Sequence, residues 1–75
     1  MSEQNPHSVN GTEYGWVIEG VWSSADKPEY WVGSSAWSQD SLKALRFARR
    51  QDAQQAADLM LDGVSVRICE HAWTA

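Results

Sequence analysis

The chain has 75 residues, with ten acidic and six basic side chains and a formal net charge of −4 at pH 7. This length allows one domain, and the net negative charge argues against broad attraction to nucleic acid or anionic membranes. Cys69 is the only cysteine, so an intramolecular disulfide is excluded, and a small chain made for an oxidising compartment usually carries several cysteines. Because the chain also lacks a signal-peptide pattern and a long apolar run, we expect a cytoplasmic protein with no membrane contact.

The start of the chain differs in composition from the rest. Residues 1–12 are polar, contain Pro6 and Gly11, and show no apolar periodicity. This composition predicts a disordered tail. The remaining residues, 13–75, are expected to form a single domain.

Aromatic and β-branched residues follow in three stretches that predict strands. Residues 14–22 carry apolar side chains at both sets of alternating positions, which is typical of a central strand. A polar loop separates them from a return strand over residues 30–37, where Gly33 predicts a bulge or a close approach. Residues 64–71 form the third predicted strand, after a helix stop at Asp62-Gly63.

The region between the second and third strands predicts a broken helix. Ser38 or Asp40 can cap a helix that begins near Ser41. One continuous helix to residue 61 would place Arg46 and Arg49 inside the apolar stripe and turn Phe47 to the opposite side. We therefore predict a short helical turn at 40–45, an extended step at 46–48 and a main helix over 49–61.

These elements predict an α+β protein of the order β-β-α-β. The last strand can pair with the first, which predicts a three-stranded antiparallel or mixed sheet in the order 2-1-3. The main helix is expected to pack on one face of that sheet. Its predicted buried stripe contains Ala53, Ala56, Ala57 and Met60.

The five tryptophans exceed what one helix can cover. Trp16, Trp22 and Trp31 cannot all lie beneath the helix if adjacent residues alternate between the two faces. Either the tail, the hairpin loop or the segment 40–48 folds over the second face, or this face binds a second copy or another protein. The predicted protein-binding residues are Trp16, Trp22, Tyr30, Trp31 and Trp37.

Two pairs of side chains are candidates for catalysis or metal binding. Cys69 and His71 lie two residues apart on a predicted strand and therefore point to the same side. Glu19 and Glu70 are candidates for a carboxylate pair if their strands are neighbours. Neither pair is accompanied by further ligands or by a nucleophile motif, so we expect no enzyme, no catalytic residue, no metal and no cofactor.

Four of the six basic residues fall within eight positions. They are Lys43, Arg46, Arg49 and Arg50. With nearby tryptophans, this cluster is the basis of an alternative function, nucleic-acid binding through charge and base stacking. The simpler interpretation is a solvated helix start in which the arginines pair with Asp40 and Asp52.

A pattern of structural residues spans about residues 14–73. Its members are WVIE at 16–19, YWVG at 30–33, Trp37, Asp40, KALRFAR at 43–49, Asp52-Ala53 and EHAW at 70–73. This pattern resembles small uncharacterised proteins encoded by bacteriophages and prophages. The resemblance implies an accessory protein that binds a host protein in the bacterial cytosol, as inhibitors of the anti-CRISPR or anti-restriction type do.

Overall fold

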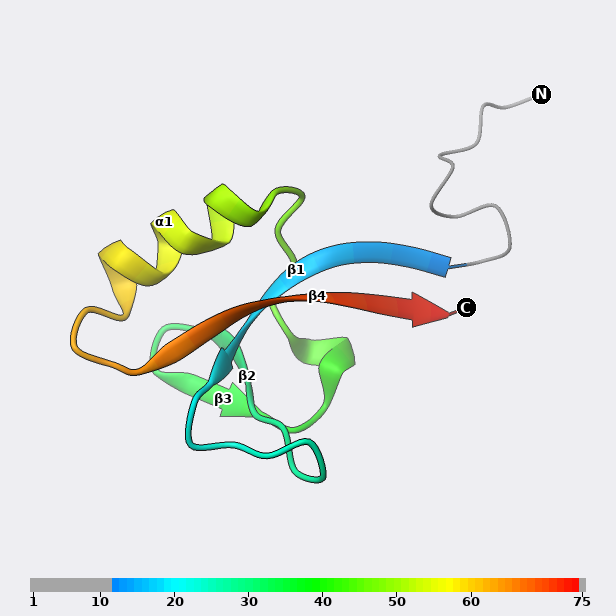
Figure 1. The fold of residues 1–75 in the computed structure, drawn as a ribbon, viewed down its shortest axis with the longest axis horizontal. Helices are drawn as coiled ribbons and strands as arrows, with labels where there is room; N and C mark the ends of the chain where they lie inside the picture. Colours follow the sequence, from blue (N-terminus) through cyan, green and yellow to red (C-terminus); the bar gives the residue numbers. More distant parts are fainter. Residues whose placement is uncertain (1–11, 75) are drawn as a thin grey trace.

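The computed structural model describes residues 12–74 and contains one sheet and one α-helix (Figure 1). The four strands are β1 (Thr12–Gly20), β2 (Tyr30–Gly33), β3 (Ala36–Ser38) and β4 (Val66–Thr74). Between β3 and β4 lie a 3-10 turn, η2 (Ser41–Lys43), and the helix α1 (Arg50–Met60). The predicted α+β class is confirmed. The tail predicted for residues 1–12 lies outside the described residues, except for Thr12, which begins β1.

The sheet has four antiparallel strands in the order β3-β2-β1-β4, where three strands in the order 2-1-3 were predicted. The number of strands was wrong and the additional edge strand β3 changes the order, while the predicted pairing of the first and last strands is confirmed. The extra strand arises because the stretch predicted as one strand, residues 30–37, reverses in its middle. Gly33 and Ser34 both have positive φ, at 114° and 55°, and such residues allow a tight reversal. After the turn, Trp31 lies opposite Trp37, with a register shift at Gly33 that confirms the predicted irregularity.

β1 lies inside the sheet, between β2 and β4. It pairs with β4 along its whole length of nine residues. β2 reaches only the end of β1, where Tyr30 lies opposite Glu19. Closer to the start of β1, the backbone of Phe47 pairs with this strand in place of β2. The Trp16 N–H donates to the Phe47 carbonyl at 2.8 Å, and the Phe47 N–H donates to the Trp16 carbonyl at 2.9 Å.

The break predicted within residues 40–61 is confirmed. Asp40 caps the short turn η2, because its Oδ1 accepts a hydrogen bond from the Leu42 N–H at 2.9 Å. Residues 44–49 are not helical, and α1 begins only at residue 50. The break allows Phe47 to pack against the hydrophobic core, where a continuous helix would have exposed it.

The helix α1 packs on one face of the sheet through its smallest side chains. Ala53 and Ala57 are buried against Ile18 in the main hydrophobic core. Met60, predicted to belong to this buried stripe, is 60% exposed, so that prediction was wrong. The helix ends at this residue, and the next residue, Leu61, turns into the core and is 7% exposed.

The opposite face of the sheet is covered in part by the segment 40–48. Ala44 is buried there with Val17 and Trp73 in a second apolar cluster. The Trp73 indole N–H donates to the backbone carbonyl of Ser41 at 2.9 Å, which fastens this segment to β4. Of the coverings expected for the second face, this one is observed.

Gly63 connects the helix to β4 with φ of 84°, and no atom within 4 Å would contact an added Cβ. We predict that Gly63→Ala lowers the free energy of unfolding by about 1 kcal/mol, because the left-handed conformation alone is strained for an L-residue. Gly63→Asn should lose less, since asparagine tolerates this conformation better. Urea denaturation measures both changes. An alanine variant as stable as the parent would contradict the left-handed geometry at this turn.

Candidate protein-binding surface

Trp22 is the most prominent exposed aromatic side chain of the described residues, at 53% exposure. It follows the end of β1, and its indole lies over Gly20, where an added Cβ would collide with the ring. The ring meets Trp37 edge to face, with centroids 4.7 Å apart. Its Nε1–H donates to Glu29 Oε1 at 3.2 Å. The indole is therefore held in one place while much of its surface stays open to solvent.

The other predicted binding residues are less accessible. Tyr30 is 6% exposed and Trp31 is 3% exposed, because both belong to the core. The Trp31 indole N–H also donates to the carbonyl of Ser34 at 3.0 Å, which stabilises the β2-β3 turn. Trp16 and Trp37 are half-buried. We name the surface formed by Trp22 and Trp37 the aromatic patch, since these two rings contact each other and Trp22 is open to solvent.

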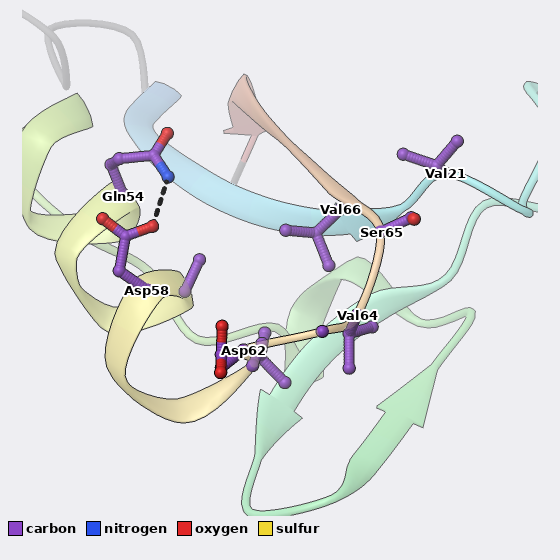
Figure 2. Close-up of a pocket in the computed structure, with 10 residues that line it drawn as sticks. Val21, Gln54, Asp58, Asp62, Val64, Ser65 and Val66 are labelled. Atoms are coloured by element: carbon purple, nitrogen blue, oxygen red, sulfur yellow. Dashed lines mark hydrogen bonds between the residues drawn. The ribbon is translucent and has the colours of Figure 1, made fainter.

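An open groove lies beside α1, between the helix and the start of β4 (Figure 2). Its volume is about 680 Å³. Ala57, Leu61 and Val66 contribute apolar side chains to it, and Asp58 and Asp62 contribute carboxylates. The groove thus has a mixed lining of apolar and polar residues, with acidic groups on its helix side.

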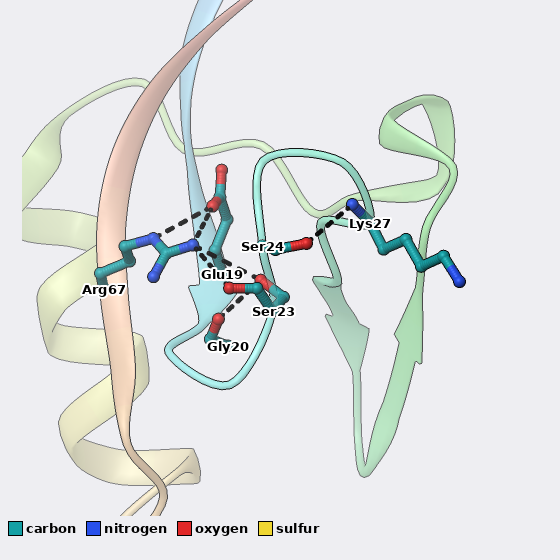
Figure 3. Close-up of polar contacts among 6 residues, drawn as sticks. All are labelled: Glu19, Gly20, Ser23, Ser24, Lys27 and Arg67. Atoms are coloured by element: carbon teal, nitrogen blue, oxygen red, sulfur yellow. Dashed lines mark hydrogen bonds and ion pairs between the residues drawn. The ribbon is translucent and has the colours of Figure 1, made fainter.

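A polar cluster anchors the loop after β1 (Figure 3). The Arg67 guanidinium pairs with Glu19 at 3.1 Å across the two neighbouring strands. It also lies 3.5 Å from the backbone carbonyl of Ser23 and from its hydroxyl. That hydroxyl donates to the carbonyl of Gly20 at 2.7 Å. These contacts fix the loop that carries Trp22, so the polar cluster supports the aromatic patch.

Cys69 and His71 project from the same face of β4, as predicted from their spacing. Burial raises the pKa of the Cys69 thiol, and the negative charge of Glu19 raises it further. A thiol with a raised pKa is protonated near neutral pH and is a poor nucleophile. His71 packs its ring against Trp73, with centroids 4.7 Å apart. Within residues 12–74, no three His, Cys, Asp or Glu side chains are grouped as metal ligands.

Stability should fall as the pH rises above about 8.5, the ordinary pKa of a thiol. In the folded chain, burial is the main cause that raises the pKa of both Cys69 and Tyr30, and the negative charge of Glu19 is the second cause. Their stabilising contribution is therefore complete below the unfolded pKa values and is lost as the pH rises through the folded ones. Urea midpoints between pH 7 and about 10.5 measure this loss. In Cys69→Ala, the part of this loss that occurs at the lower pH values should disappear. An unchanged dependence of the urea midpoint on pH in that variant would contradict the prediction.

The proposed carboxylate pair does not form. Glu19 lies opposite Arg67 in the register of β1 and β4, whereas Glu70 lies opposite Trp16. Since neighbouring positions of a strand alternate between faces, the two glutamates project from opposite faces of the sheet. They cannot act together on one substrate.

The basic cluster is partly neutralised. Arg46 pairs with Glu13 at 2.8 Å, and its guanidinium lies 4.0 Å from the centre of the Trp73 ring. Arg49 pairs with Asp52, with two hydrogen bonds of 3.0 and 3.1 Å. Among residues 12–74, no ion pair involves the other two basic residues of the cluster. The Arg49 pairing agrees with the solvated helix start described above.

The comparisons with known proteins do not indicate a function for this chain. The chain matches no protein-family model, no curated protein and no solved structure. Within residues 12–74, none of the helices combines the length and the apolar character needed to cross a membrane.

Sequence reasoning identified Trp22 but missed what holds it in place. The position of Gly20 is the missed signal: it lies two residues before the tryptophan, at the end of a strand, where the absence of a Cβ leaves room for a ring. The pairing of Arg67 with Glu19 was also missed, because it joins residues 48 positions apart in the sequence.

Proposed function

We propose that this chain is an accessory protein that acts by binding another protein non-covalently through the aromatic patch. Its sequence pattern, similar to that of small phage and prophage proteins, supports a bacterial host protein as the partner. Inhibition of a host defence system is the outcome that we propose for this binding.

One observation carries the proposal: Trp22 is half open to solvent and yet held in a fixed position. Its ring is supported by Trp37 and by the absence of a side chain at Gly20, and its indole N–H is bonded to Glu29. Tryptophan is among the residues that contribute most to binding energy at protein interfaces. An anchor that is ordered before binding also loses less conformational entropy when the partner arrives.

The site supports binding better than catalysis or nucleic-acid recognition. The Cys69 thiol has a raised pKa, and the two glutamates considered for acid–base chemistry point away from each other. In the basic cluster, Arg46 and Arg49 are already paired with carboxylates, and the chain as a whole carries a charge of −4. Phosphate contacts at these two arginines would have to displace those partners.

The experiment has two steps. The immobilised full chain captures its partner from bacterial cytosol, and mass spectrometry identifies it. The purified partner is then titrated with the parent chain and with Trp22→Ala by isothermal calorimetry. If Trp22 is a binding hot spot, the variant should bind at least about 30-fold more weakly.

The matched control is Leu59→Ala, which removes another exposed apolar side chain, on α1. It should bind the partner as the parent does. Equal affinity of the Trp22→Ala variant and the parent, or equal weakening by both variants, would show that the aromatic patch is not the interface.

A further inference from the structure

The strand β4 has a long open edge. It pairs with β1 over nine consecutive residues without a bulge, and no other strand within residues 12–74 pairs with its outer side. The Ser65 carbonyl accepts the N–H of Val21, so the odd-numbered residues of this strand direct their backbone groups toward β1. The even-numbered residues, Val66 to Thr74, therefore direct their N–H and C=O groups outward.

This edge lacks most of the features that usually prevent strands from pairing with other chains, and its only charged residues are Arg67, which is paired with Glu19, and Glu70. Natural edge strands are short, carry lysine or proline, or contain bulges. The edge strand on the far side of the sheet, β3, follows this rule with three residues. In contrast, β4 has nine residues, no lysine, no proline and an uninterrupted register. We infer that a second copy of the chain pairs with this edge, forming a homodimer through β4.

The side chains of β4 indicate how the two copies align. In a symmetric dimer the two strands run antiparallel, and the position of the two-fold axis decides which residues meet. An axis through Glu70 would place two carboxylates directly opposite each other, which is destabilising. An axis through Cys69 places Ile68 opposite Glu70 of the second copy. It also places Val66 opposite Ala72 and Arg67 opposite His71 of the second copy, so no like charges meet at pH 7 when histidine is counted as neutral.

An axis displaced further toward the start of β4 would pair a shorter stretch of the strand. The axis through Cys69 pairs residues 66–72, and an axis through His71 would pair a stretch of equal length, residues 68–74. We place the axis through Cys69, because this register alone brings two thiols opposite each other and is therefore checked directly by crosslinking. This register joins the two four-stranded sheets into one continuous sheet. This seam lies at the opposite edge of the sheet from β3 and so leaves the aromatic patch free for another protein.

The alignment brings the two Cys69 side chains together at the axis. Because the backbone groups of Cys69 face β1, the two cysteines form a non-hydrogen-bonded pair, whose Cα atoms are about 4.5 Å apart. That separation is within the range of about 4.4–6.8 Å that a disulfide spans. Diamide, a mild oxidant, accepts two electrons and two protons from the two thiols as the S–S bond forms. Crosslinking through Cys69 thus reports the register.

The first test is the mass in solution. Light scattering should give twice the chain mass of 8.4 kDa for the parent. Glu70→Pro removes an outward N–H that the β4-β1 ladder does not use, and it should weaken dimerisation at least tenfold while the circular dichroism stays unchanged. The matched control is Glu70→Ala, which also removes the carboxylate but keeps the N–H, and it should remain dimeric.

Ala72→Lys is a second edge variant, should the proline disturb the fold. Alanine 72 is exposed, and a lysine on an edge strand opposes pairing. Diamide should convert the parent into a crosslinked dimer on a non-reducing gel, and Cys69→Ser should not crosslink. A parent that stays monomeric at millimolar concentration overturns the inference. A dimer that persists in the edge variants but dissociates in Trp22→Ala assigns the contact to the aromatic patch and also overturns it.

Discussion

Trp31→Ala should remove a large share of the free energy of unfolding of this chain. The Trp31 side chain is 3% exposed and belongs to the main core, together with Ile18 of β1 and Ala53 of α1. Replacing a buried tryptophan by alanine costs about 3–5 kcal/mol. A chain of 75 residues has a total stability of roughly 4–11 kcal/mol, at about 0.05–0.15 kcal/mol per residue. The variant also loses the hydrogen bond to Ser34 that holds the β2-β3 turn.

Circular dichroism and urea denaturation measure this loss, and Trp22→Ala is the matched control. Trp22 is the same residue type but is 53% exposed, so its removal should cost less than about 1 kcal/mol. The comparison separates a structural tryptophan from a binding one. A stable Trp31→Ala variant would mean that this indole is not part of the core.

Ala53→Leu should lower the free energy of unfolding by about 1–3 kcal/mol, because it adds volume where the packing leaves none. Ala53 is fully buried between α1 and the sheet, beside Ile18. Leucine is nearly as good a helix former as alanine, so helix propensity does not account for the loss. With a urea m-value of about 1 kcal/mol/M, the midpoint should fall by about 1–3 M.

Gln55→Leu is the control, at an exposed position of the same helix. It introduces the same side chain without crowding the core and should change the midpoint little. An equal loss in both variants would show that the leucine acts through helix formation or association, and that α1 does not depend on its small residues to lie close to the sheet.

Local arguments predicted the helical region well because charge and apolar spacing are local properties. The positions of Arg46 and Phe47 were incompatible with one continuous helix, and the structure contains the break. The same reasoning failed at Met60, since periodicity assumes that the helix continues. The chain instead leaves the helix there, and Leu61 enters the core in its place.

The sheet was harder to predict because its extra strand depends on one backbone conformation. Ser34 has a positive φ of 55°, which residues other than glycine adopt rarely. Nothing in the apolar pattern of residues 30–37 indicates that the chain turns at this point. The reversal is stabilised by the Trp31 indole, which bonds to the Ser34 carbonyl, and by the Trp31-Trp37 pairing that follows.

The tryptophans were also predictable only in part. Their number indicated that one helix could not cover both faces of the sheet, and the segment 40–48 does cover part of the second face. Which indoles stay open was decided by contacts between distant segments. Trp31 is buried in the main core with Ile18, whereas Trp22 rests on Gly20 and Trp37.

Propensity, charge placement and alternation act over a few residues, and they were sufficient to predict the class of the fold, the broken helix and the pairing of first and last strands. The order of four strands, the exposure of Trp22 and the open edge of β4 could not be predicted in this way. Those features depend on which segments meet across the core, and the free energy of such contacts is not encoded in any single stretch of the chain.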